Sequence, residues 1–595
     1  MVTYRAPLDD LRFVLYALHD YPARVAALPG CEEATAELVD AVLEEAARFC
    51  ENELLPLNQP GDAAGCSFEN GVVRTPAGFK EAYRAFCEGG WNGLACDPAF
   101  GGQGLPKTLQ FLVSELICST NLSFGTYPGL SHGAYHLLER CASDQQKAAF
   151  LPKLAAGAWS GTMCLTEPHC GTDLGLIRTR AEPGEGGAYK ITGTKIFISA
   201  GEHDLADNIV HLVLAKLPDA PPGTKGISLF IVPKFLVKAD GGLGPRNGVA
   251  CGGIEDKMGI KASATCVLNF DAAEGYLVGA PHGGMRAMFT MMNMARLTVG
   301  LQGLGLAETA YQSAAAYARE RRAGRALSGA KQPDQPADPI VVHPGVRGDL
   351  MTMRALTEGA RALAFWVALE LDRAERHPDP AAREAAEDLV ALLTPIVKAA
   401  LTDIGFEVTN LGVQTFGGHG YIRDNGMEQL VRDARIAQIY EGTNAIQALD
   451  LVGRKLAQDY GRPLRRFFHP VREFLEAKQT TPELAEFVAP LAKVYGRLQR
   501  ATLWLAQNSL RDPEEAGAAA NDYLRLFALA CFAYLWARAA EVSLARADGF
   551  PPEFHDAKLA TARFYMQRIL PQSSGLFAAI MAGKASTMAL DEAAF

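Results

Sequence analysis

The chain has 595 residues, of which 49% are hydrophobic, so it is long enough to form roughly three or four domains with large cores. Its formal net charge of −10 is spread without long runs of one sign, which argues against a groove for nucleic acid. The twelve cysteines show no C-x-x-C pair and no metal-ligand spacing, so we expect buried, reduced thiols and no metal site.

The first part of the chain reads as an extension followed by helices. Residues 1–35 form the extension, and its start, M1-V-T-Y-R-A-P-L, resembles neither a secretory signal nor a transit peptide. We therefore expect a cytoplasmic protein. From 36 to 160 apolar residues recur every three or four positions, which predicts a helical domain.

The middle of the chain changes to short, β-rich runs. Between 161 and 280 these include A188-Y-K-I-T-G-T-K-I-F-I-S and G226-I-S-L-F-I-V, which predict a compact β domain. Helical spacing returns over 281–460, and a further helical unit covers 461–595. The longest apolar run there, Leu526–Ala537, is twelve residues long, which is too short to span a bilayer.

One carboxylate stands out in the second helical region. Glu441 lies between an aromatic residue and a glycine in R435-I-A-Q-I-Y-E-G-T-N-A-I-Q. A carboxylate that loses hydration among such neighbours becomes a better base near neutral pH, so Glu441 is a candidate catalytic base. The alternative is a helix C-terminus with Gly442 as its left-handed cap and Glu441 in solvent. Upstream, the three glycines of Q414-T-F-G-G-H-G-Y allow close approach of the main chain to a ligand.

Two segments of the β domain have the composition of a ring-binding site. The segment M163-C-L-T-E-P-H-C-G-T-D-L-G carries hydroxyls at Thr166 and Thr172, and K195-I-F-I-S places Phe197 and Ser199 on one strand face. Together they could hold a planar ring. Ordinary strand packing followed by a turn is the alternative for either segment alone.

These segments, together with K257-M-G-I-K-A-S-A-T, Q414-T-F-G-G-H-G and Y440-E-G-T, resemble the flavin-dependent acyl-CoA dehydrogenase family over roughly residues 36–455. The resemblance implies a mainly α-helical α+β fold. It would comprise an N-terminal helical domain, a middle β-barrel and a C-terminal four-helix bundle, followed here by an additional helical domain. The expected boundaries are 1–35, 36–160, 161–280, 281–460 and 461–595.

The resemblance also assigns roles to residues. Glu441 would remove a proton from Cα of an acyl-CoA thioester, its main-chain N–H would bind the thioester carbonyl, and Gly442 would lie beside it. Thr172 and Arg296 would also contact the substrate, although an arginine on an apolar helix can equally pair with a buried acid. The implied FAD-binding residues are Met163, Leu165, Thr166, Phe197, Ser199, Arg321, Gln414, Gly418 and Thr443.

Some positions test or weaken this assignment. Family members with the base on another helix carry it at the position of Ala295, so the alternative base is absent here and Glu441 is favoured. Arg321 would reach the FAD pyrophosphate of a neighbouring subunit, against the alternative of a solvated helix charge. Gly324 and Ala445 depart from the family pattern and put the adenosine contacts in doubt.

The length resembles a bacterial branch of the family that includes 3-(methylthio)propanoyl-CoA dehydrogenases, which implies a homodimer. We expect 3-(methylthio)propanoyl-CoA as substrate, with a medium- or long-chain fatty acyl-CoA as the alternative, and electron-transfer flavoprotein as partner. Phe124, Tyr127 and Leu130 either line the acyl pocket or belong to the core. An acyl-CoA oxidase, a nitroalkane oxidase and a non-catalytic binding platform are the competing functions.

Overall fold

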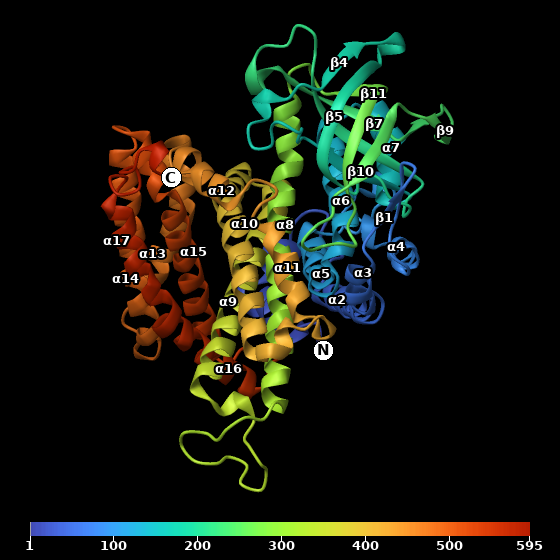
Figure 1. Ribbon diagram of the computed structural model, residues 1–595. Helices are drawn as coiled ribbons and strands as arrows, with labels where there is room; N and C mark the ends of the chain where they lie inside the picture. The colour runs from blue at the N-terminus through green and yellow to red at the C-terminus, as the bar shows by residue number, and fades with distance from the viewer. Residues whose placement is uncertain (1) are drawn as a thin grey trace. The chain divides into compact units, whose positions relative to one another are not determined.

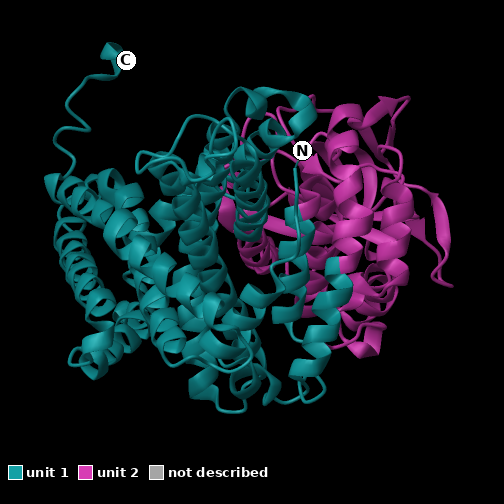
Figure 2. Cartoon of the chain, turned by 90° about the horizontal axis from the view of Figure 1, so that it is seen from below, with its two compact units in different colours: residues 1–47, 106–119, 299–595 teal, residues 48–105, 120–298 magenta. Residues whose placement is uncertain are grey.

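The computed structural model describes residues 2–595, which form two compact units. Of the described residues, unit 1 comprises 2–47, 106–119 and 299–595, and unit 2 comprises 48–105 and 120–298 (Figure 2). Both units are therefore assembled from segments that are distant in sequence. The domain boundaries given above remain predictions.

Unit 2 begins with short helices, as the periodicity over 36–160 predicts. Its helices are α3 (Leu55–Ala64), α4 (Phe79–Glu88), α6 (Leu122–Cys141) and α7 (Asp144–Ala155). Ser143 starts α7 with a capping box, in which Ser143 and Gln146 each accept a backbone N–H of the other. A small hairpin of β1 (Ser67–Glu69) and β2 (Val72–Arg74) interrupts the helices and was not expected.

The β domain of unit 2 is a closed barrel. Strands β11, β5, β4, β6 and β7 pair in this order, and β7 pairs with β11 again, while β10 and β3 extend the sheet at β11 and β6. All seven residues of β7 are buried, which accounts for its continuous apolar sequence. The strands are β3 (Trp159–Cys164), β4 (Arg180–Pro183), β5 (Tyr189–Ser199), β6 (Asn208–Lys216), β7 (Ile227–Pro233), β8 (Phe235–Val237), β9 (Leu243–Arg246), β10 (Val249–Ile254) and β11 (Thr265–Val278).

Long helices dominate unit 1 (Figure 1). They confirm the helical bundle, and α8 and α10 approach each other closely because glycines face each other: a Cβ on Gly303 would lie 2.3 Å from the carbonyl oxygen of Leu401. The helices are α8 (Gly284–Glu320, whose second half belongs to unit 1), α9 (Pro344–Arg376), α10 (Pro380–Phe416), α11 (Met427–Ala437) and α12 (Asn444–Asp450).

The last region is helical, as predicted, and its helices pack together (Figure 1, orange to red). They are α13 (Arg462–Lys478), α14 (Ala485–Asn508), α15 (Pro513–Leu544), α16 (Pro552–Phe564) and α17 (Ser573–Ala582). The apolar run at Leu526 lies inside α15, and by length and composition alone both α15 and the helical segment over Pro380–Tyr421 could cross a membrane. Their most apolar windows are 83% and 78% buried within the protein, as in core helices of a folded domain.

The N-terminal extension and the last helical region meet α9 in a buried cluster of charges in unit 1. Helices α1 (Leu8–Arg12), α2 (Ala36–Phe49) and α5 (Lys107–Thr120) belong largely to the same unit. Arg361 donates to three carboxylates, and Lys558 of α16 donates to two. This charge cluster consists of Asp10, Glu115, Glu308, Glu358, Arg354, Arg361 and Lys558.

Candidate active site

The candidate base lies in a sharp turn between two helices of unit 1. Helix α11 ends at Ala437 and α12 begins at Asn444, so Glu441 belongs to neither helix. Its φ of 57° and that of Gly442, 84°, are both in the left-handed region, which is costly for a residue with a side chain. Glu441 is half-buried rather than fully in solvent. The simple capping alternative therefore does not describe this turn.

The residues on either side of this turn are tied to neighbouring helices. The Tyr440 hydroxyl donates to Oε1 of Gln302 on α8, and burial raises the pKa of Tyr440 above its usual value, so the phenol stays protonated. Thr443, predicted as an FAD contact, caps α12 by accepting the N–H of Ile446 at 3.3 Å. The turn is thus fixed at both ends.

A second predicted group of residues gathers around a hollow in unit 1. Helix α10 ends at Phe416, Gly417 follows with φ 60°, and a pocket of about 380 Å³ is lined by Arg321, Gly418 and their neighbours. The ring of Tyr317 stacks on Phe416 with centroids 4.1 Å apart. The pocket residues are Tyr317, Arg321, Ile340, Thr415, Phe416, Gly417, Gly418 and His419.

This pocket fits the phosphate and adenosine end of a dinucleotide. An arginine, exposed glycine main chain and a flat aromatic pair are the groups that phosphates and a purine ring recognise. Gln414 lies exposed on the last turn of α10, next to this pocket in sequence. Sequence reasoning missed Tyr317 and His419, whose side chains hydrogen-bond to each other at 2.7 Å.

In unit 2 the two segments predicted to bind a planar ring lie against each other. The N–H of Ile196 donates to the carbonyl of Thr166 at 2.9 Å, and the ammonium of Lys195 donates to the carbonyl of Leu165 at 2.9 Å. The same ammonium bonds Glu167 at 2.9 Å. Glu167, His169 and Cys170 have ligand atoms within 4.8 Å of one another, but Lys195 already occupies the carboxylate that a metal ion would need.

Phe197 is the predicted FAD contact in unit 2 whose aromatic ring is exposed on the surface of the barrel. It is 59% exposed, although it comes from a strand of the barrel, and its φ is 58°. The register between β5 and β11 shifts at this point, so a β-bulge directs Phe197 outward. Ser199, two residues further along β5, and Thr166, whose carbonyl accepts the N–H of Ile196, are half-buried. Met163 is 9% exposed and packs in the hydrophobic cluster that the barrel forms with the helices of unit 2. An exposed aromatic ring beside hydroxyls suits a planar cofactor.

Thr172 and Arg296, the other two residues predicted to contact the substrate, lie in unit 2 in different environments. Thr172 is exposed in the loop after β3, and Arg296 is buried on α8 with its guanidinium 6.0 Å from the ring of Phe289. Phe124 and Tyr127 are fully buried, and the Tyr127 hydroxyl donates to the carbonyl of Ala262 at 3.0 Å. Of the two interpretations for these aromatic residues, the core is therefore correct.

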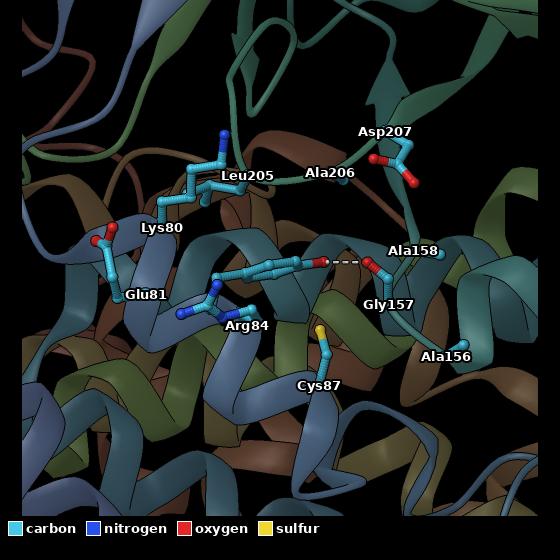
Figure 3. A pocket seen from close by; sticks show the side chains of 11 residues that line it. Lys80, Glu81, Arg84, Cys87, Ala156, Gly157, Ala158, Leu205, Ala206 and Asp207 are labelled. Atoms are coloured by element: carbon cyan, nitrogen blue, oxygen red, sulfur yellow. Dashed lines mark hydrogen bonds between the residues drawn. The ribbon is translucent and has the colours of Figure 1, made fainter.

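Unit 2 has another hollow, unrelated to any predicted site residue. It has a volume of about 290 Å³ and lies between α4 and the turns that precede β3 and β6 (Figure 3). Lys80 and Arg84 flank it together with Glu81 and Asp207, so no single sign of charge prevails. All twelve cysteines of the described residues are free, and Cys87 in this hollow has its pKa raised to about 11 by burial. Cys87 is therefore an unreactive thiol at neutral pH.

The closed barrel and the helical bundle form the fold of a flavin-dependent dehydrogenase of acyl thioesters, and the candidate base Glu441 lies in a left-handed turn between two of the helices. The chain belongs to the acyl-CoA dehydrogenase family: the N-terminal, middle and C-terminal domains of acyl-CoA dehydrogenase match residues 37–158, 162–273 and 282–456. Residues 467–591 match the acetyl-CoA dehydrogenase C-terminal-like domain. Its cofactor is FAD, as in the family, and the exposed Phe197 and the Arg321 pocket fit that cofactor.

Named relatives extend over almost the whole chain. A 3-methylmercaptopropionyl-CoA dehydrogenase of Ruegeria pomeroyi is 44% identical over 583 residues, which are 96% of this chain and 97% of the relative. A butyryl-CoA dehydrogenase of Syntrophomonas wolfei is 35% identical and covers 94% of this chain and 93% of its own. The crystal structure of Caenorhabditis elegans ACDH-11 with C11-CoA has a TM-score of 0.78 at 19% identity, covering 95% of this chain and 91% of that one, which supports the fold alone.

Proposed function

We propose that the protein oxidises the Cα–Cβ bond of an acyl-CoA thioester to a trans-2-enoyl-CoA, with Glu441 as the base. The observation that carries this proposal is the Glu441 turn, a half-buried carboxylate held with a left-handed backbone between two helices. A backbone conformation of this kind persists where the surrounding structure fixes it, and such positions cluster at active sites. FAD, when bound, accepts the hydride that leaves Cβ.

The proton that Glu441 removes is only weakly acidic, so this turn must supply more than a base. The charge that develops on the thioester oxygen needs preorganised hydrogen-bond donors, and these are worth several kcal/mol in a site without water. The main-chain N–H of Glu441 is the donor that the family resemblance assigns. A rigid turn therefore serves both the carboxylate and the N–H, because both belong to one residue.

For the acyl group we propose 3-(methylthio)propanoyl-CoA. Support comes from the 44% identity to the Ruegeria relative of that name over nearly the full length of both chains. A straight-chain fatty acyl-CoA is the second candidate, which the butyryl-CoA dehydrogenase relative favours. Specificity for one methylene is worth only about 1–3 kcal/mol in an apolar pocket, so both thioesters must be compared directly.

We also propose that the protein is a homodimer and passes its electrons to electron-transfer flavoprotein in the cytoplasm. The position of Arg321 supports the dimer, because the family places this arginine against the FAD of a neighbouring subunit. Its pocket in unit 1 is open and lined by polar and aromatic groups. The electron acceptor follows from the family resemblance alone.

An anaerobic titration of the holoenzyme tests the function. Methylthiopropanoyl-CoA and straight-chain acyl-CoAs of increasing length are added, and the flavin absorbance should bleach with the preferred thioester at the lowest concentration. Glu441→Gln should keep the yellow cofactor but lose bleaching by at least about 10³-fold, because the amide is no base. Full bleaching in this variant would refute the role of Glu441.

The competing functions give different results in the same preparation. Rapid reoxidation of the bleached flavin by air would identify an oxidase. A protein that stays colourless after addition of FAD would instead be a binding platform. Bleaching by a nitroalkane and not by any thioester would identify a nitroalkane oxidase.

A further inference from the structure

A buried lysine holds the turn that carries Glu441. Lys398 lies on α10 with 0% of its surface exposed, and its ammonium donates to the carbonyl of Gly442 at 2.8 Å. The amide of Gln447 on α12 donates to the carbonyls of Glu441 and Gly442 at 3.2 and 3.4 Å. Both carbonyls of the turn are thus bound by side chains from two helices of unit 1.

The same ammonium also fixes the residue where α12 begins. Lys398 donates to Oδ1 of Asn444 at 2.8 Å, and Nδ2 of Asn444 donates to Thr402 at 3.0 Å and to Asp403 at 2.7 Å. Asp403 in turn accepts from Gln438 at 2.7 Å, just before the turn. This hydrogen-bond network therefore fastens both ends of the turn to a single face of α10.

The buried ammonium of Lys398 is energetically costly, and an apolar side chain could fill the same space without this cost. Burial of an ammonium is unfavourable unless it is fully hydrogen-bonded, and an apolar residue of the same length would fill the space of Lys398 without that cost. The left-handed backbone at Glu441 and Gly442 is also unfavourable. Charge-assisted bonds to the carbonyl side of the turn hold its N–H groups and the Glu441 side chain in one orientation.

We propose that Lys398 is a positioning residue for the reaction, with Gln447 in a supporting role. It acts through the Gly442 carbonyl and Asn444, which keep the carboxylate and main-chain N–H of Glu441 at their working positions. This inference rests on the proposed function of Glu441. A displacement of about 1 Å at a catalytic group can lower a rate on the order of 10²-fold, which sets the effect to expect.

The test uses the FAD-loaded full chain with Lys398→Met, which keeps the length of the side chain and removes its charge and donors. Lys493→Met, at an exposed position of α14, is the matched control. Flavin content, melting temperature, the dissociation constant for acyl-CoA and the rate of anaerobic bleaching at saturating acyl-CoA are measured for each. Gln447→Met removes the longer, uncharged bonds and provides a second, milder variant.

We expect the bleaching rate to fall while the binding of FAD and acyl-CoA is retained. Lys398→Met should retain FAD and bind acyl-CoA within about threefold of the wild type, while its bleaching rate falls on the order of 10²-fold. Gln447→Met should lose roughly 3–10-fold in rate, and Lys493→Met nothing. Unchanged rates in both turn variants, or losses that only follow loss of FAD, would overturn the role of Lys398. If Lys398→Met does not fold, Gln447→Met decides by the same criteria. A wild-type protein that no thioester bleaches would instead refute the underlying function.

Discussion

Glu115→Gln should make the protein more resistant to alkaline pH. Glu115 of α5 is completely buried, and Nε and Nη2 of Arg361 donate to its Oε1 at 2.8 and 2.6 Å. Three cations of the charge cluster face four carboxylates, so one negative charge is left over. Asp10 contacts both Arg361 and Lys558, and these charges outweigh its burial and lower its pKa. Burial raises the pKa of Glu115 to about 7, so Glu115 takes up the proton.

The size and sign of the effect follow from this shift. A carboxyl group with a raised pKa in the folded state stabilises it fully below the unfolded value of 4.5, and this stability is lost as pH rises through about 7. At 1.36 kcal/mol per pH unit, ionised Glu115 costs the folded protein about 3 kcal/mol at pH 8. A glutamine keeps the acceptor for Arg361 and cannot ionise, so this cost disappears.

The assay is the melting temperature of Glu115→Gln and wild type between pH 5 and pH 8. The amide nitrogen enters the position of Oε2, which has no hydrogen-bond partner among the described residues, so a constant offset between the two proteins is expected. The variant should gain on the wild type by roughly 2–4 °C between the two pH values. Glu486 forms an ion pair with Arg563 near the surface. As the control, Glu486→Gln should differ from the wild type in melting temperature by the same amount at every pH. A flat or falling difference for Glu115→Gln would refute this account of the cluster.

Two further variants test the cofactor pocket and the helix crossing of unit 1. Arg321→Gln should weaken FAD binding by about 10–100-fold, measured as flavin retained per protein after dilution, because a charge-assisted bond to phosphate is lost. Arg319→Gln, at an exposed position two residues earlier near the end of α8, should retain FAD. Gly303→Ala should lower the free energy of unfolding by about 3 kcal/mol, since its Cβ would lie 2.3 Å from the carbonyl oxygen of Leu401. Gly453→Ala, with open space around it, should change it by less than about 1 kcal/mol, and equal melting temperatures would contradict the close packing of α8 and α10.

The sequence predicted the fold classes of the segments well, because each has a hydrophobic period of its own. Alternating and continuous apolar runs mark the barrel strands, and the glycines after Phe416 mark the end of α10, where Gly417 has φ 60°. The exposure of Phe197 depends on a β-bulge, which arises from pairing with β11 and leaves no local signal. The hairpin at Ser67 also escaped prediction because its strands have only three residues each.

The candidate site residues also differ in whether a local sequence signal or only tertiary packing reveals their role. The neighbours of Glu441 in the sequence mark it as a candidate base, and this role stays a prediction. Phe124 and Tyr127 could be assigned to core or pocket only by packing, since both roles use the same apolar helix surface. Lys398 did carry a signal: a single lysine within the apolar run T394-P-I-V-K-A-A-L predicts a buried, partnered cation. Its partner Gly442 lies 44 residues away, so only the fold reveals what it binds.

The charge cluster also explains why the chain's two extensions belong to one folding unit. Asp10 comes from the N-terminal extension and Lys558 from α16, and both contact the same part of α9 in unit 1. Removal of the N-terminal extension would take one of its two carboxylate partners from Lys558, and removal of α16 would take the Lys558 ammonium from both Asp10 and Glu358. The extensions are therefore integral to the unit that carries Glu441, since their loss would destabilise the helices that hold the Glu441 turn.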